Sequence, residues 1–247
     1  KTTREFFGVM PKPKKGQLLT IMAFAAHDNK LLPTLEKVGR ELTSVQRALG
    51  EYLEAQRASF ARFYFVGDED LLEVIGNGKS PVLIAKHLRK MFGGIAALQL
   101  EKDTKITAIV SGEGETVPLP DTIDADGQKV NDWLGNLAQG MVGALAANVN
   151  TGIKELPADP QGIVAWIQKY PNQVACLALQ ARWTALVEDA LTGPGCGTVA
   201  DAMAAILDVL AQSVLTPDLH PVLRAKIEQI ITVAVYQRDA SRALAAQ

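Results

Sequence analysis

A stripe of apolar residues between residues 28 and 60 constrains the fold more than any other feature of the sequence. Its members follow one another at alternating steps of four and three, a spacing that places them on one face of an α-helix. At 1.5 Å per residue, about 28 helical residues make a rod on the order of 40 Å long. Asp28 or Asn29 can cap its start, and Pro33 is tolerated in a first turn. The stripe comprises Leu31, Leu35, Val38, Leu42, Val45, Leu49 and Tyr52.

A helix of this length suits mechanical or scaffolding work, and it also suits one member of an ordinary helical bundle. In a load-bearing role the helix must not slide past its neighbours, so its apolar stripe must be tightly packed. We therefore expect a packed helix seam, formed by Leu35, Val38, Leu42, Val45 and Leu49.

The sequence RFYFVGDED, which begins at Arg62, follows the predicted long helix. Four large apolar residues and then a group of acids are typical of two features: a strand that leads into a catalytic acidic loop, and a structural joint. We favour the joint, because Gly67 and Asp68 supply a turn and a helix N-cap before a short helix at about 69–75. Tyr64 and Phe65 are expected to be buried. The predicted joint comprises Phe63, Tyr64, Phe65, Gly67 and Asp68.

Turn signals and hydrophobic periodicity divide the rest of the chain into short helices, one small sheet and further helices. Ser80 and Pro81 start a helix whose inner side is expected to carry Leu83, Ile84, Leu88 and Met91. The period then shortens to about 2, which predicts three antiparallel strands near 96–100, 105–111 and 116–119. Further helices are expected at 129–149, 161–169, 172–191, 198–215 and 222–246. The predicted fold is mainly α, with one long helix and a small inserted antiparallel β-meander.

The composition is that of a folded chain without a strong net charge. Of its 247 residues 48% are hydrophobic, and 25 Lys and Arg stand against 27 Asp and Glu. Nucleic-acid-binding proteins usually carry an excess of basic residues, so a formal net charge of -2 argues against this class of function. Neither a signal peptide nor a run of about 18 apolar residues is apparent, so no membrane partner is expected. Cys176 and Cys196 lack metal-site spacing, and we expect a soluble protein in a reducing, cytosolic setting.

Motifs for catalysis or metal binding are weak. The acids at 68–70 and Glu73 offer oxygen ligands, but acids are favoured in any first helical turn and no EF-hand loop surrounds them. The sequence GPGCGT resembles a phosphate-binding loop, yet a helix precedes it and Gly197 stands where a lysine is needed. The three histidines are far apart, and no nucleophile has a triad context. We expect no catalytic residue, metal or cofactor in this chain.

The stretch QRALGEYLEAQRASFARFYFVGDEDLLEVIGN, residues 46–77, closely resembles the linker region of dynein heavy chains, and the cytoplasmic form more than the axonemal one. The family commonly has proline where Ala61 stands, and a helix breaker there agrees with ending the long helix at Phe60. The resemblance continues through HLRKMFGGI, EGETVPL and the pair Trp133 and Leu134. It reappears in WIQKYPNQVACLALQARWTALVEDAL and in YQRDASRAL.

The resemblance implies a mechanical element of a minus-end-directed microtubule motor in the cytoplasm and cytoskeleton. In this family the linker is a curved stack of helical bundles that lies across a ring of six AAA+ modules, and it bends and straightens as the ring turns over ATP. The ring would hold the ATP and Mg and would be this chain's partner within the microtubule motor complex, so the chain itself would not be an enzyme. Expected docking groups on its surface are Arg62, Glu69, Asp70, Arg238 and Arg242.

On this reading the chain is one linker fragment with four segments: a poorly matched lead-in (1–27), the long helix with the joint and short helices (28–94), the β-meander (95–120) and a helical bundle (121–247). Two alternatives of other classes remain open. One is a free-standing helical adaptor or scaffold that binds a protein partner along the seam of the long helix. The other is an enzyme with an unfamiliar site.

Overall fold

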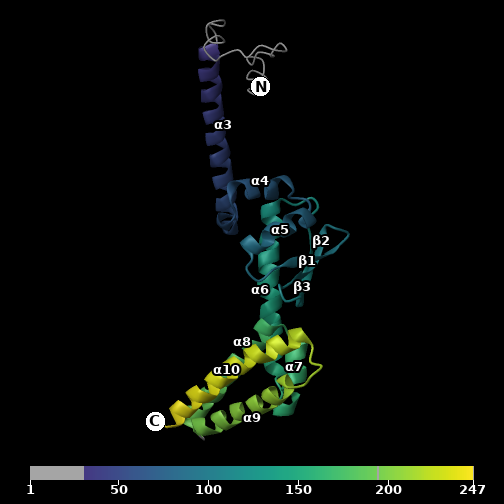
Figure 1. The fold of residues 1–247 in the computed structure, drawn as a ribbon, viewed down its shortest axis with the longest axis vertical. Helices are drawn as coiled ribbons and strands as arrows, with labels where there is room; N and C mark the ends of the chain where they lie inside the picture. The colour runs from purple at the N-terminus through teal and green to yellow at the C-terminus, as the bar shows by residue number, and fades with distance from the viewer. Residues whose placement is uncertain (1–30, 194, 247) are drawn as a thin grey trace, which may run out of the picture. The chain divides into compact units, whose positions relative to one another are not determined.

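The computed structural model describes residues 31–193 and 195–246 of the chain (Figure 1). The chain divides into two compact units, unit 1 ending at Leu72 and unit 2 beginning at Glu73. Each unit is described by itself below. The mainly α fold with a small antiparallel sheet, predicted from periodicity, is confirmed.

Unit 1 consists of a long helix followed by a sharp turn. Helix α3 (Leu31–Ser59) has Pro33 in its first turn, as expected, whereas the predicted caps Asp28 and Asn29 lie outside the described residues. Phe60 is extended and ends the helix, and the chain then forms the short 3-10 helix η1 (Ala61–Phe65). Helix α4 (Asp68–Gly76) follows and contains the boundary between the two units.

The apolar stripe of α3 is mostly exposed, so the expectation of a packed seam is wrong for the part of the chain that the structure describes. Of the five seam residues only Val38 is buried, and the exposed fraction is 56% for Leu42 and 59% for Val45. Leu35, Leu49 and Tyr52 are exposed as well, and Leu53 near the end of the helix is buried. The heptad-like spacing correctly predicted the helix, but spacing does not say what covers the stripe.

The first helix that lies wholly in unit 2 is α5 (Pro81–Met91), for which Ser80 is the N-cap residue. Ile84, Leu88 and Met91 face inward as predicted. Leu83 does not, because it is 52% exposed, and the inner position is taken by His87, which is buried. A histidine is accepted there because its ring bonds to Glu73.

Three strands follow in the order β1 (Ala97–Glu101), β2 (Lys105–Val110) and β3 (Thr116–Asp124), paired antiparallel as a meander. The two turns are at the predicted positions, with positive φ angles at Lys102, Asp103 and Gly114. Strand β3 runs five residues beyond its predicted end, through Pro120. Prolines are tolerated there because β3 is an edge strand with one side unpaired.

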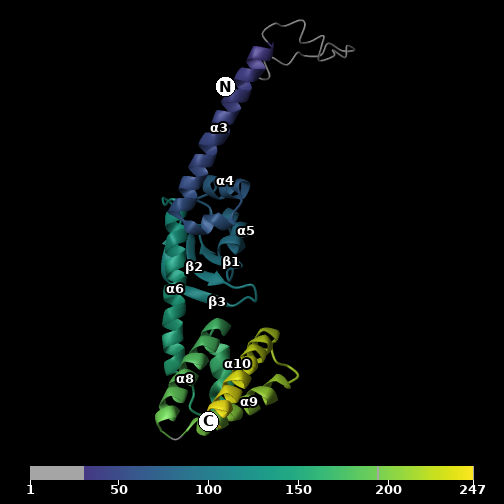
Figure 2. The ribbon, with the colours of Figure 1, turned by 90° about the vertical axis from the view of Figure 1, so that its left-hand side faces the viewer.

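The remaining helices form a bundle that is joined to the sheet through one of its members. Helix α6 (Val130–Lys154) packs against β3 and also against α8, so it belongs to both parts (Figure 2). After the short η2 (Pro160–Gly162) the bundle contains α7 (Ile163–Lys169), α8 (Asn172–Thr192), α9 (Cys196–Val214) and α10 (Pro221–Ala245). Helices α9 and α10 pack along each other, and α8 contacts both.

All three tryptophans of the sequence lie in unit 2, and each joins two elements through its indole N–H. Trp133 of α6 donates to the carbonyl of Gly78 at 2.8 Å. Trp166 of α7 donates to the carbonyl of Gly152 in α6 at 3.1 Å. Trp183 of α8 donates to the hydroxyl of Ser241 in α10 at 3.0 Å. A large apolar ring with one polar group combines core packing with a directional bond, which fixes how the elements meet.

Helix α9 has the length and hydropathy that could span a membrane, the one helix in the described part of the chain that does. Core helices of globular proteins meet the same criterion. In this structure Val199, Met203, Leu207 and Leu210 of α9 are buried, and the helix packs on α8 and α10.

Leu53 and Leu42 of α3 allow a matched test of the exposed stripe. We expect Leu53→Ala to lower the free energy of unfolding by about 2–5 kcal/mol, because it leaves a cavity at a site that is 2% exposed. Leu42→Ala is expected to change it by no more than about 0.5 kcal/mol, since the side chain is in solvent. Chemical denaturation of both variants, followed by circular dichroism, measures the difference. A large cost at Leu42 would show that the stripe is packed within this chain.

Candidate functional site

The predicted aromatic joint exists, but its buried residue is not the one expected. Phe63 is completely buried and its ring meets that of Phe60 edge to face, with centroids 5.0 Å apart. Tyr64 and Phe65 are 57% and 72% exposed, so the expectation that they are buried is wrong. The 3-10 geometry of η1 explains this: about three residues complete a turn, so neighbouring side chains in the sequence point in different directions.

Arg57 braces the joint, a role that the sequence did not suggest. Its guanidinium donates to the carbonyl of Val66 at 3.2 Å and to Oδ1 of Asp68 at 2.6 Å. Asp68, predicted as a helix cap, thus ties the start of α4 back to the last turns of α3. The carbonyl of Gly67 accepts from the N–H of Leu71 and so belongs to the first turn of α4. The joint is a bend held by one arginine.

On the outer face of the joint Tyr64 donates its hydroxyl to Glu54 at 2.6 Å. That hydrogen bond, together with some burial, raises the pKa of the Tyr64 phenol above its usual value. Tyr64 therefore connects η1 to α3 through a hydrogen bond at the protein surface. It is not part of the core.

The predicted docking groups fall into two sets. Arg62, Glu69 and Asp70 belong to unit 1, whereas Arg238 and Arg242 lie on α10 in unit 2. Asp239 lies 2.8 Å from Arg238 and 4.0 Å from Arg242. Their docking role stays a prediction.

Glu73, one of the acids considered for metal binding, is engaged by two bases of α5. Lys86 lies 2.5 Å from its carboxylate and His87 lies 3.2 Å away. The hydrogen bond from Lys86, aided by the one from His87 and opposed by burial, holds the pKa of Glu73 below its usual value. Within unit 2, the negative charge of Glu73 is therefore offset by Lys86 and its carboxylate is hydrogen-bonded by His87.

Glu115 lies in the β2–β3 turn, directly before β3, and contacts both α10 and α8. Its Oε1 lies 2.6 Å from the ammonium of Lys226 in α10, and both side chains are largely buried, at 15% and 12% exposed. Its two oxygens also accept the backbone N–H of Asn172, the first residue of α8, at 3.1 and 3.2 Å. Lys226 donates further to the carbonyl of Tyr170 at 2.9 Å. We call Glu115, Lys226 and the N–H of Asn172 the ionic clamp.

The ionic clamp satisfies two electrostatic demands at once. The first N–H groups of a helix have no partner within the helix and carry partial positive charge, which a carboxylate stabilises. A lysine held away from water needs an anion close by. Glu115 meets both, and it thereby ties the sheet to two helices of the bundle.

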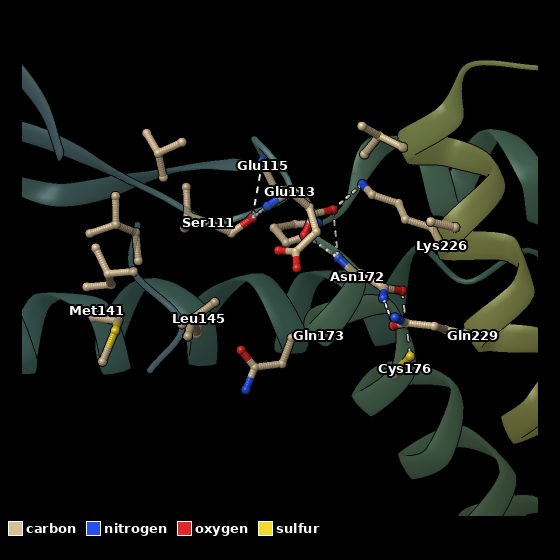
Figure 3. Close-up of a pocket in the computed structure, with 18 residues that line it drawn as sticks. Ser111, Glu113, Glu115, Met141, Leu145, Asn172, Gln173, Cys176, Lys226 and Gln229 are labelled. Atoms are coloured by element: carbon tan, nitrogen blue, oxygen red, sulfur yellow. Dashed lines mark hydrogen bonds and ion pairs between the residues drawn. The ribbon is translucent and has the colours of Figure 1, made fainter. Parts of the chain in front are cut away.

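A cleft of about 350 Å³ lies beside the ionic clamp (Figure 3). Its apolar lining includes Ile109, Val117, Met141, Leu145 and Val222, contributed by the sheet, α6 and α10. Its polar groups come from the β2–β3 turn and the bundle, and they include Glu113, Gln173, Cys176 and Gln229. Burial, and to a smaller degree the charge of Glu115, raise the pKa of the Cys176 thiol, which disfavours a thiolate nucleophile.

A second cluster closes the connection between α6 and α7. Glu155, directly after α6, accepts hydrogen bonds from Lys169 and from the Tyr170 hydroxyl. These bonds, led by the one from Lys169, hold the pKa of Glu155 below its usual value. Glu155 and Glu115 therefore anchor the two ends of the segment that carries Tyr170.

Arg57, Glu115, Lys226 and Asn172 were not identified from the sequence as site residues. The available signal was that EGETVPL, which contains Glu115, and WIQKYPNQVACLALQARWTALVEDAL, which contains Asn172, match motifs of one family. Glu115 is 57 residues from Asn172 and more than 100 residues from Lys226, and no local pattern pairs them.

A family model and individual relatives both match this chain to dynein heavy chains. The family model "Dynein heavy chain, N-terminal region 2" matches residues 1–152. A cytoplasmic dynein heavy chain of Fusarium vanettenii is 40% identical over 245 residues, and one of Caenorhabditis elegans is 41% identical over 220 residues. These matches cover 95% and 85% of this chain. One of Dictyostelium discoideum is 39% identical over 259 residues, or 97% of this chain. The chain spans only 5–6% of the length of these relatives.

Phe63→Ala tests the joint. We expect it to lower the free energy of unfolding by about 3–5 kcal/mol, because the ring is fully buried. Phe65→Ala is the matched control, since it removes the same group two residues away from a site that is 72% exposed, and its expected cost is below about 1 kcal/mol. Urea denaturation measures both. Equal costs would contradict the assignment of Phe63 as the core of the joint.

A double-mutant cycle with Glu115→Gln and Lys226→Met tests the ionic clamp. Glu115→Gln is expected to cost about 2–3 kcal/mol, because it leaves a largely buried ammonium without its anion, and the coupling energy should be about 1–3 kcal/mol. Arg47 and Glu51 on α3 provide the control pair, with a similar contact of 3.0 Å between side chains that are 82% and 69% exposed. Their coupling should not exceed about 0.5 kcal/mol. Equal coupling in both cycles would show that the ionic clamp is an ordinary surface pair.

Proposed function

The chain belongs to the dynein heavy chain family, and on this premise we propose that it is part of the mechanical linker of a dynein microtubule motor. As a lever, it would convert nucleotide-driven changes of an AAA+ ring into displacement. The ring of the same heavy chain would be its partner and would hold ATP and Mg, so this chain needs no catalytic residue of its own. Relatives bear the word cytoplasmic in their names, and we place this chain in the cytoplasm and cytoskeleton.

The observation that carries the proposal is the double connection between the sheet and the helical bundle of unit 2. Helix α6 packs against β3 and against α8, and the ionic clamp joins the β2–β3 turn to α8 and α10. A single connection allows rotation about it, whereas two connections separated in space resist rotation. A lever needs this resistance, because motion lost inside the lever does not reach its end.

The exposed stripe of α3 supports a second candidate function, that of a free-standing helical adaptor. Leu42 and Val45 are more than half exposed on a helix with coiled-coil spacing, which suits an additional helix laid along it. In the motor such a helix would come from another part of the heavy chain, and in an adaptor from a different protein. Mass spectrometry of the native gene product separates the two, because a mature chain of 247 residues would rule out the lever.

Glu115→Gln in the intact heavy chain tests the lever. The ATP sites lie in the ring under this proposal, so basal ATP turnover should be largely retained. Microtubule gliding should be slower, because a loosened connection between the sheet and the bundle lets part of the displacement in each ATPase cycle be lost within the lever. Both are measured on the same preparation, by phosphate release and by gliding velocity.

Glu188→Gln is the matched control, since Glu188 is an exposed residue of α8 that does not line the cleft. Its motor should glide at the normal speed. Normal gliding by the Glu115→Gln motor, with the ionic clamp shown to be broken, would contradict the lever. Equal loss of gliding and ATP turnover would contradict it too, because a lever defect spares the chemistry.

A further inference from the structure

The cleft beside the ionic clamp carries an acid that the clamp does not use. Glu115 is matched by Lys226, but Glu113, two residues earlier in the β2–β3 turn, makes no side-chain hydrogen bond or ion pair within residues 31–193 and 195–246. Figure 3 shows its carboxylate between Glu115 and Gln173, and the side chain is exposed. With two glutamates and one lysine, the charged side chains that line the cleft leave one negative charge in excess.

The floor of the cleft is apolar and adaptable. Met141 and Leu145 of α6 line the cleft together with Ile109 and Val117 of the sheet. Methionine has a flexible, polarisable side chain that conforms to different occupants. A volume of about 350 Å³ is at the small end for a ligand site and admits one or two long side chains.

An apolar floor beside an unmatched carboxylate fits a side chain with an aliphatic stem and a cationic head. Arginine and lysine lay their methylene groups along apolar surfaces and keep the charged group at the edge. Arginine can also bind a carboxylate through two parallel hydrogen bonds. The amide of Gln173, which has no hydrogen-bonding partner among the described residues, can accept another bond from such a head.

We propose that this cleft is a docking site for a basic side chain, arginine or lysine, presented by a polypeptide segment outside this chain. Its stem lies on Met141 and Leu145, and its head pairs with Glu113 and bonds to Gln173. The relatives of this chain are far longer than its 247 residues, which span 5–6% of their length. The remainder of such a heavy chain can supply the segment. The docking does not depend on the lever, because it requires the cleft alone.

Three small probes test the proposal on the 247-residue chain by two-dimensional NMR. The first is Nα-acetyl-arginine methylamide, whose single charge is on the side chain. The second is the citrulline analogue, which has nearly the same shape and no charge. We expect the arginine probe to shift amide signals of the cleft-lining residues in a saturable way, with an affinity about fivefold above that of the citrulline probe, as for one partly solvated ion pair. It should also slow the alkylation of Cys176, which lines the cleft.

Glu113→Gln should abolish the difference between the two probes, and Glu188→Gln should preserve it. Because Glu113 is exposed, its substitution does not threaten the fold. Equal affinities for both probes in the wild-type chain, saturable shifts confined to other surfaces, or no saturable shift would overturn the proposal. The third probe, spermidine, distinguishes a free polyamine from a polypeptide: binding as tight as that of the arginine probe would contradict a polypeptide occupant.

Discussion

The contact between Glu115, Lys226 and the N–H of Asn172 is the interaction on which the arrangement of unit 2 depends. It joins the sheet to two helices with charges that are largely removed from water, where an unmatched partner is costly. Helix α6 and the tryptophan bonds hold the neighbouring elements, but they do not connect the β2–β3 turn to α8 and α10. The ionic clamp therefore determines how the sheet meets the bundle, and it also forms one wall of the cleft.

Most helices, strands and turns could be predicted, because they depend on local patterns. The apolar periodicity of α3, the glycine before α4 with the acids of its first turn, and the proline before α8 each act within a few residues of the element that they start or end. Strand β3 was predicted too short, since Pro118 and Pro120 are usually breakers and are harmless only on an edge strand. Whether a strand lies at an edge is a property of the assembled sheet, and no local pattern contains it.

The candidate site was harder to predict, because it is made by contacts between distant residues. The stripe of α3 and the pair Tyr64 and Phe65 are apolar, yet they face solvent, while Phe63 beside them is fully buried. Hydrophobicity shows that a residue can be buried, and the geometry of η1 decides which one is. Glu113 and Glu115 are equivalent in the sequence EGE, but among the described residues only Glu115 pairs with a lysine. The family resemblance drew attention to this motif without separating the two acids.

The central claim is that the ionic clamp fixes the sheet on the helical bundle. The most direct test is a distance distribution from electron spin resonance, with spin labels at cysteines that replace Lys102 in the β1–β2 turn and Glu188 in α8, in a chain with Cys176→Ser and Cys196→Ala. The account predicts one narrow distribution for this chain, and a clearly broader one when Glu115→Gln is added, because the direct tie from the β2–β3 turn to α8 and α10 is then lost. Distributions of equal width with and without Glu115 would contradict it.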